Sequence, residues 1–121
     1  MKLSKAEEEL MQYLWKLKKA FMKDLLDEFP KPKPATTTVA TLLKRMQDKG
    51  FVGYAEFGKL REYYPLVTKE KYFSKHIKGL IYNFFNNSPA QFASFFTEQT
   101  NLSKEELEEL KNIIDKELKK K

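Results

Sequence analysis

Apolar residues recur along most of this chain at the spacing of an α-helix with one buried face. The clearest stripe is formed by Val39, Leu42, Leu43 and Met46, at positions i, i+3, i+4 and i+7. Stripes of this kind, together with capping residues, predict helices over residues 4–18, 21–29, 36–50 and 69–86, a short one opened by Ser88 and Pro89, and a last one opened by Ser103.

Two strand-like runs follow the third predicted helix. Residues 51–56 and 62–67 are rich in aromatic and branched side chains, and residues 57–61 between them are predicted to form a hairpin tip. Proline has no backbone N–H group to donate to a strand ladder. Pro65 therefore indicates that the second run is an edge strand, or that Pro65 is among the final residues of the strand.

The order of these elements indicates the fold. Helix, helix, turn, helix and hairpin is the order of a winged helix-turn-helix, in which the third helix reads DNA and the hairpin leans on the backbone. We therefore predict a mainly α protein: a winged helix-turn-helix of three helices plus a β-hairpin over residues 1–67, and a helical dimerisation region over residues 68–121.

The helix predicted over residues 36–50 has two different faces. Opposite its apolar stripe, at about 100° per residue, lie Thr37, Thr41 and Lys44, flanked by Thr38 and Arg45 on one side. Threonine is a poor helix former, so its abundance here needs a reason. Short hydroxyl side chains let a helix approach the DNA major groove closely, while lysine and arginine neutralise phosphates. An ordinary amphipathic helix with a threonine-rich start is the alternative.

The charge distribution agrees with a DNA-binding role for this region. The chain has a net charge of +6, and residues 29–61 alone contain seven lysine or arginine residues and two acidic ones, a local excess of +5. Such an excess on one module suits a polyanion, although solvated lysine-rich surfaces are also common. The predicted DNA-binding residues are Thr36, Thr37, Thr38, Thr41, Lys44, Arg45, Lys59 and Arg61.

The C-terminal region carries more large apolar side chains than three short helices can cover. We expect them to form an interface between two copies of the chain, since an exposed patch of that size would otherwise aggregate. The predicted interface residues are Tyr72, Phe73, Ile77, Leu80, Ile81, Phe84, Phe85, Phe92, Phe95, Phe96, Leu107, Leu110 and Ile114. Folding of this tail back onto the N-terminal domain is the alternative.

Composition argues against several other classes of protein. The chain of 121 residues contains no cysteine, which excludes disulfides and thiolate metal sites and fits a cytoplasmic protein. No apolar run approaches the length of a membrane span, and no signal peptide is recognisable. His76 is the single histidine and has no second imidazole nearby in sequence, while the glutamate runs Glu7–Glu9 and Glu105–Glu106 are explained by capping and solubility. We predict no enzyme activity, no metal and no cofactor.

Several short motifs together resemble one family of regulators. The segment from Thr38 to Phe51, T-V-x-T-L-L-x-R-M-x-x-K-G-F, is the strongest, and it is supported by Leu14-Trp15, Tyr63-Tyr64-Pro65 and the closing L-S-x-E-E-L-E-E-L from Leu102. In this order they are similar to the penicillinase-repressor family, the BlaI and MecI type of transcriptional regulators. The resemblance covers nearly the whole chain.

This resemblance implies a homodimeric repressor that reads an inverted repeat, and a membrane sensor with a metalloprotease domain whose signal ends in repressor cleavage. Relatives are cut before a phenylalanine in the dimerisation region, for which Ser94-Phe95 and Phe95-Phe96 are the candidate bonds here. Ala40 stands where related repressors often carry a basic residue. The cysteine-rich tail of copper-responsive relatives is missing.

We therefore predict a repressor that occupies an operator in double-stranded DNA as a homodimer, without inserting into a membrane. The alternative is a winged-helix module that binds another protein and has no operator. Salt-dependent binding to duplex DNA distinguishes the two, because a repressor releases counterions from phosphates when it binds.

Overall fold

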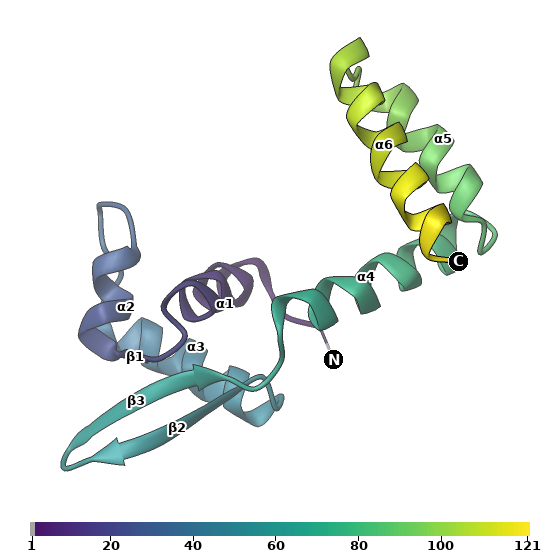
Figure 1. The fold of residues 1–121 in the computed structure, drawn as a ribbon. Coiled ribbons are helices and arrows are strands. Elements are labelled where there is room, and N and C mark those ends of the chain that lie inside the picture. The colour runs from purple at the N-terminus through teal and green to yellow at the C-terminus, as the bar shows by residue number, and fades with distance from the viewer. Residues whose placement is uncertain (1) are drawn as a thin grey trace. The chain divides into compact units, whose positions relative to one another are not determined.

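The computed structural model describes residues 2–121, which form two compact units (Figure 1). The first unit ends at Phe73 and the second spans Ser74–Lys121. The sequence had suggested a boundary between residues 67 and 68. The boundary lies six residues later because the Tyr72 side chain, only 5 % exposed, belongs to the core of the first unit.

The first helix, α1 (Lys5–Leu17), begins as predicted. Ser4 is its N-cap, and the Ser4 and Glu7 side chains form the reciprocal hydrogen bonds of a capping box. Its buried face consists of Glu7, Leu10, Met11 and Leu14, whereas Ala6 is exposed.

A two-residue strand, β1 (Ala20–Phe21), follows α1 and was not predicted. It pairs antiparallel with β3, so the sheet has the order β1-β3-β2. Two residues are too few to show an alternating pattern, and this strand therefore depends on its partner.

The second helix, α2 (Met22–Glu28), lies within the predicted range 21–29 and ends before the prolines at positions 30, 32 and 34. The ammonium group of Lys33 folds back onto the end of this helix, donating to the carbonyl oxygens of Leu26 at 2.9 Å and Phe29 at 3.0 Å. These bonds satisfy carbonyl groups that lack partners at a helix C-terminus.

The third helix, α3 (Thr36–Asp48), has the predicted core face. Val39, Leu43 and Met46 are fully buried and Leu42 is partly buried against the same cluster. The helix stops two residues before the predicted end, and Gly50 adopts a φ of +84°, the left-handed geometry expected of a residue that closes a helix.

The strands β2 (Val52–Phe57) and β3 (Leu60–Pro65) form a longer hairpin than predicted. Residues 57, 60 and 61, assigned in the sequence to the tip, are in the strands, and the turn consists of Gly58 and Lys59 alone. Gly58 has a φ of +63°, which suits the first central position of a two-residue hairpin turn. Pro65 is the last residue of β3, which is the central strand and not an edge strand.

The second unit contains the rest of α4 (Lys69–Phe84), α5 (Pro89–Gln99) and α6 (Lys104–Lys120). α4 ends two residues before the predicted position, where Asn86 and Asn87 take positive φ angles. Ser88 caps α5, and Ser103 with Glu106 forms the predicted capping box of α6. Neither α5 nor α6 contains a buried residue.

Candidate nucleic-acid interface

The outward face of α3 is the candidate reading surface. All of its predicted DNA-binding residues are exposed: Thr36, Thr37, Thr38, Thr41, Lys44 and Arg45. The opposite face is anchored by fully buried side chains, so the helix cannot rotate about its axis without opening the core. Polar groups are thus held rigidly on one side.

The hydroxyl group of Thr41 is already engaged. It donates a hydrogen bond of 2.9 Å to the backbone carbonyl oxygen of Thr37, one helical turn earlier. With its proton used in this way, the Thr41 side chain offers lone pairs and a methyl group outward. It can accept a hydrogen bond or contact a thymine methyl group without breaking a bond of its own.

The N-terminus of α3 lacks a side-chain cap. Ala35 is the N-cap residue and makes no side-chain bond, and the first turn contains no acidic residue. Backbone N–H groups at such an end, together with the helix dipole, favour an anion. Phosphates that flank a groove occupied by α3 would meet this end.

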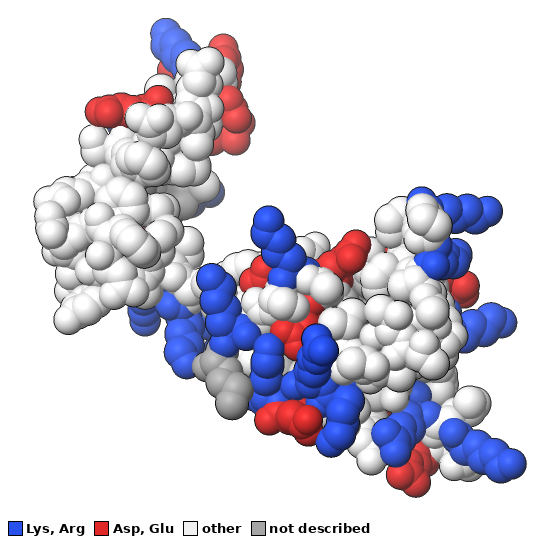
Figure 2. All heavy atoms as spheres, turned by 180° about the vertical axis from the view of Figure 1, so that it is seen from behind, with Lys and Arg blue, Asp and Glu red and all other residues white. Residues whose placement is uncertain are grey.

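The cations near α3 divide into engaged and available ones. Lys33 caps α2, and Lys49 donates to a buried carboxylate, so neither is free for DNA. Lys44 pairs with Asp48 at 2.9 Å, but both side chains are exposed and such a pair is weak enough to exchange for a phosphate. Within residues 2–121, Arg45 and Lys59 make no ion pair. Figure 2 shows basic side chains spread over one face of the first unit.

The two basic residues predicted at the hairpin tip are in different settings. Lys59 lies in the turn and is exposed. Arg61 is in β3, and its guanidinium group lies over the ring of Tyr54 in β2, 4.3 Å from the ring centroid. This cation–π contact orients Arg61 along the face that Tyr54 shares with the buried Tyr63 ring.

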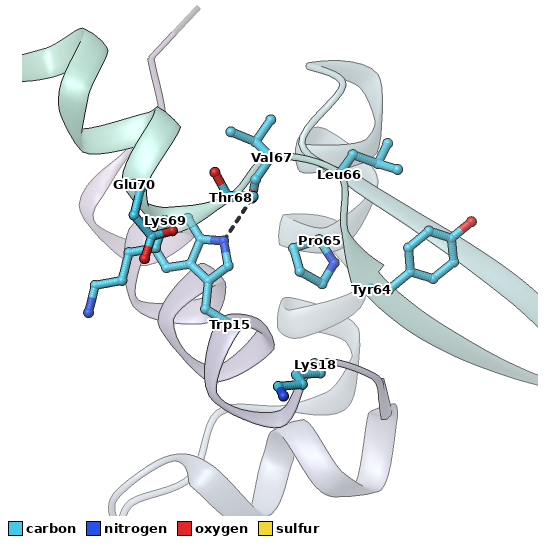
Figure 3. Close-up of a pocket in the computed structure, with 9 residues that line it drawn as sticks. All are labelled: Trp15, Lys18, Tyr64, Pro65, Leu66, Val67, Thr68, Lys69 and Glu70. Atoms are coloured by element: carbon cyan, nitrogen blue, oxygen red, sulfur yellow. Dashed lines mark hydrogen bonds between the residues drawn. The ribbon is translucent and has the colours of Figure 1, made fainter.

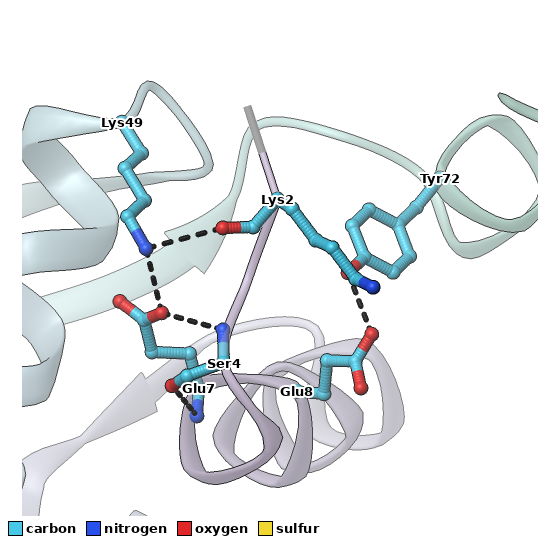
Figure 4. A network of polar contacts seen from close by, with 6 residues as sticks. All are labelled: Lys2, Ser4, Glu7, Glu8, Lys49 and Tyr72. Carbon is cyan, nitrogen blue, oxygen red and sulfur yellow. Dashed lines mark hydrogen bonds and ion pairs between the residues drawn. The ribbon is translucent and has the colours of Figure 1, made fainter. Parts of the chain in front are cut away.

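A buried ion pair joins α1 to the end of α3 (Figure 4). Lys49, directly after α3, donates to Glu7 Oε1 at 2.7 Å, and Glu7 is only 1 % exposed. Burial raises the pKa of Glu7, but the hydrogen bonds from Lys49 and Ser4 outweigh it and the pKa lies below its ordinary value. The expectation that the Glu7–Glu9 run is solvated was therefore wrong for Glu7, because a capping carboxylate here also meets a cation from a distant element.

The junction between β3 and α4 is fixed by two side chains of α1. The indole N–H of Trp15 donates to the carbonyl oxygen of Val67 at 2.8 Å (Figure 3), and Glu8 accepts a hydrogen bond of 2.6 Å from the Tyr72 hydroxyl group (Figure 4). Burial and the Glu8 carboxylate raise the pKa of Tyr72 to about 12. Trp15 also lines an open cavity of about 410 Å³ beside this junction, together with Lys18 and residues 64–70.

Tyr72 must therefore be removed from the predicted dimer contacts. Its ring lies in the core of the first unit, against Phe51 and Trp15, so it is not available to a second copy. Phe73 packs against the same tryptophan but remains partly exposed. A single helical stripe in the sequence could not reveal that α4 changes its environment after its first turn.

The other predicted contact residues lie in the second unit and are largely uncovered. Phe84 is 76 % exposed, and six other predicted contact residues are exposed as well: Ile77, Leu80, Phe95, Phe96, Leu107 and Ile114. Phe85 contacts Phe92 and Phe95, with ring centroids 5.5 and 5.3 Å apart. Figure 2 shows a broad uncharged area on the side of this unit that is in view.

Among residues 2–121, no group of three or more histidine or acidic side chains is placed to hold a metal ion. The helices of this part of the chain are also all too short or too polar to cross a membrane.

Comparison with known proteins identifies the family. The family model described as penicillinase repressor matches residues 3–116. The chain belongs to the penicillinase repressor family. This family is one of DNA-binding transcriptional repressors with a winged helix, which agrees with the arrangement of α1 to β3.

Named relatives of the penicillinase repressor family align over nearly the whole chain. The methicillin resistance regulatory protein MecI of Staphylococcus aureus strain N315 is 31 % identical over 94 % of each chain. The MecI protein of Mammaliicoccus sciuri is 30 % identical over the same shares. The penicillinase repressor of Bacillus licheniformis is 26 % identical over 93 % of this chain and 89 % of its own length.

Proposed function

We propose that this protein represses transcription by occupying an inverted-repeat operator as a homodimer. The observation that carries the proposal is the outward face of α3, where exposed threonine, lysine and arginine side chains are backed by a fully buried apolar face. A helix of this kind fits the major groove, where side chains reach base edges and phosphates. Lys59 at the hairpin tip lies where a winged helix meets the backbone of the flanking DNA.

A homodimer accounts for the second unit. Its helices leave large apolar side chains exposed, which in a monomer would be a liability for aggregation. Burying them against the same surface of a second copy gives a two-fold symmetric assembly, and two-fold symmetry in the protein matches an inverted repeat in DNA. The proposed contacts are those predicted from the sequence without Tyr72.

The relatives are named for methicillin resistance regulation and penicillinase repression, which supports a regulatory role of a similar kind. We propose that the protein acts in the cytoplasm, where a repressor meets its operator. Induction by a membrane sensor-protease is the corresponding route to release. Its candidate bonds, Ser94-Phe95 and Phe95-Phe96, lie inside α5. A protease that binds its substrate in extended form would therefore have to unwind this helix before cutting.

A selection of bound fragments from a random duplex pool tests the proposal. The expected result is an enriched sequence with two-fold symmetry, bound with an affinity that falls steeply as salt rises. The alternative function is a winged-helix module that binds a protein, and the exposed apolar side chains of the first unit, such as Leu66, favour it. Absence of any duplex binding at low salt would contradict the proposed repressor function and favour the protein-binding module.

A further inference from the structure

The end of the hairpin is a two-stranded ribbon that extends beyond the backbone pairing of the third strand. β1 pairs only with Glu62 and Tyr63 of β3, so the strands continue past it towards the turn. Every residue from Ala55 to Arg61 is exposed. Figure 1 shows the hairpin as a long ribbon that ends in this turn.

The tip of this ribbon is apolar. Phe57 and Leu60 form the last cross-strand pair, and cross-strand partners lie on the same face of a ladder. Phe57 is 55 % exposed and Leu60 is 62 % exposed. Between them Gly58 has no side chain, so Lys59 carries the sole charge of the four tip residues. The Phe57 ring contacts the ring of Phe21 in β1, with the two centroids 6.0 Å apart. Among the described residues, Leu60 belongs neither to the buried core nor to the partly buried side chains packed against it.

We propose that Phe57 and Leu60 enter the DNA minor groove beside the segment read by α3 and pack against its deoxyribose walls. This inference rests on the proposed function. The minor groove is about 6 Å wide, whereas two paired strands about 4.8 Å apart are broader once their side chains are included. Only the turn can enter, and its two large side chains are apolar. Apolar side chains are known to contact and wedge the minor groove in other DNA-binding proteins.

The charges around the tip agree with shallow entry. Lys59 is placed to contact the phosphates at the rim of the groove, and such a contact would fix the position of the tip on the DNA. Arg61 is held over Tyr54, on the other face from Phe57 and Leu60. The carboxylates of Glu56 and Glu62 follow directly behind the tip, and deeper entry would bring them towards the phosphates. The apolar pair is therefore the part of the ribbon suited to the groove.

Three single variants of the full-length chain test this assignment. Leu60→Thr removes an apolar tip side chain and keeps a residue that favours strands. Leu66→Thr is the matched control, because Leu66 is 56 % exposed but lies just beyond the other end of β3. Lys59→Ala removes the tip charge. Each is titrated with the duplex selected from the random pool, over a range of salt concentrations, after thermal melting has established that it is folded.

Leu60→Thr is expected to bind roughly tenfold more weakly with the salt dependence unchanged, the size expected for losing about two buried methylene-sized groups. Lys59→Ala is expected to make the slope of log affinity against log salt shallower by about one. Leu66→Thr should bind like the unaltered protein. Hydroxyl-radical cleavage, which attacks sugar hydrogens along the minor groove, should show flanking protection that Leu60→Thr loses.

Other results would overturn the inference. If Leu60→Thr bound as well as Leu66→Thr, or lost affinity together with a change in salt slope, the tip would not make an apolar groove contact. A change in self-association without a change in DNA affinity would assign Phe57 and Leu60 to a protein contact instead. In these cases duplex binding by the unaltered protein still supports the repressor, whereas no duplex binding at all would remove both proposals.

Discussion

At the scale of single residues, the Thr41 hydroxyl group shows how local geometry restricts recognition. Because its hydroxyl group donates a hydrogen bond to the Thr37 carbonyl oxygen, the Thr41 side chain can offer DNA only a methyl group and acceptor lone pairs. A base contact through this side chain therefore depends mainly on shape and on the methyl group.

The first prediction compares Thr41→Ala with Thr41→Val. Thr41→Ala should cost about 1–3 kcal/mol of operator affinity, as expected for a lost base contact. Thr41→Val keeps the methyl group and should lose much less. Titration of the selected duplex measures both, and thermal melting serves as the folding control. Equal losses in the two variants would show that the hydroxyl oxygen, and not the methyl group, makes the contact.

The second prediction concerns the buried pair of Glu7 and Lys49. Removing one partner of a buried pair typically costs about 3–5 kcal/mol, and since Lys49 is partly exposed we expect about 2 kcal/mol for Glu7→Gln at neutral pH. Lys49→Met should cost at least as much, because it leaves the Glu7 carboxylate buried without its cation. Urea denaturation measures the free energy of unfolding of each variant.

The stability deficits of both variants should shrink in acid, but for different reasons. The folded-state pKa of Glu7 is below its ordinary value of 4.5, so its contribution is fully present above that value and is lost as pH falls through the folded-state pKa. The stability difference between the unaltered protein and Glu7→Gln should therefore shrink in acid. In Lys49→Met the unpaired carboxylate gains a proton more easily when folded, so part of its deficit should be recovered in acid. A pH-independent difference in both would contradict the ion pair.

At the scale of elements, the first turn of α4 belongs structurally to the DNA-binding unit. Tyr72 fills a place in its core and bonds to Glu8, while the preceding segment is held by the bond from Trp15 to Val67. The end of this domain is therefore set by packing and not by the start of a helix.

The third prediction follows from that boundary. A fragment ending at Lys75 should be more stable than one ending at Val67 by about 3 kcal/mol or more, the usual cost of emptying a large aromatic site. Thermal or urea unfolding of the two fragments provides the comparison. Equal stability would place the boundary at residue 67, as the sequence had suggested.

At the scale of the whole molecule, affinity for an inverted repeat depends on two copies being joined. Reading helices of such a dimer are separated by roughly 34 Å, one turn of DNA. The second unit can set this affinity without touching a base. Cleavage within α5 would weaken binding by separating the copies, without a need for a ligand pocket.

The fourth prediction tests the dimer directly. The full-length chain should sediment as a dimer at micromolar concentration, and Ile114→Asp should shift it towards monomer because it places a charge in the apolar surface of α6. Asn112→Asp adds the same charge at an exposed position on the other side of α6 and should leave the dimer intact. A monomeric unaltered chain would contradict the proposed repressor mechanism.

The sequence by itself determined the elements whose causes are local. Helical periodicity located the stripe of Val39, Leu43 and Met46, and Ser4, Ser88 and Ser103 each marked a helix start within one residue. These features depend on contacts within one or two turns, and the exposed face of α3 followed from the same periodicity. The family could be named because its motifs lie in these locally determined segments.

Tertiary structure alone decided what depends on residues far apart in the chain. The strand β1 consists of two residues and forms only by pairing with β3. Glu7 is buried with an ion-pair partner, Lys49, that lies 42 positions away in the sequence. Tyr72 lies in the core of the first unit because it contacts Glu8 and Phe51, which are also distant in the sequence. The predicted hairpin tip had five residues, but the observed turn has two, because cross-strand pairing extends to Phe57 and Leu60. A periodic pattern fixes which face is apolar, but which partner covers that face is set by the folded chain.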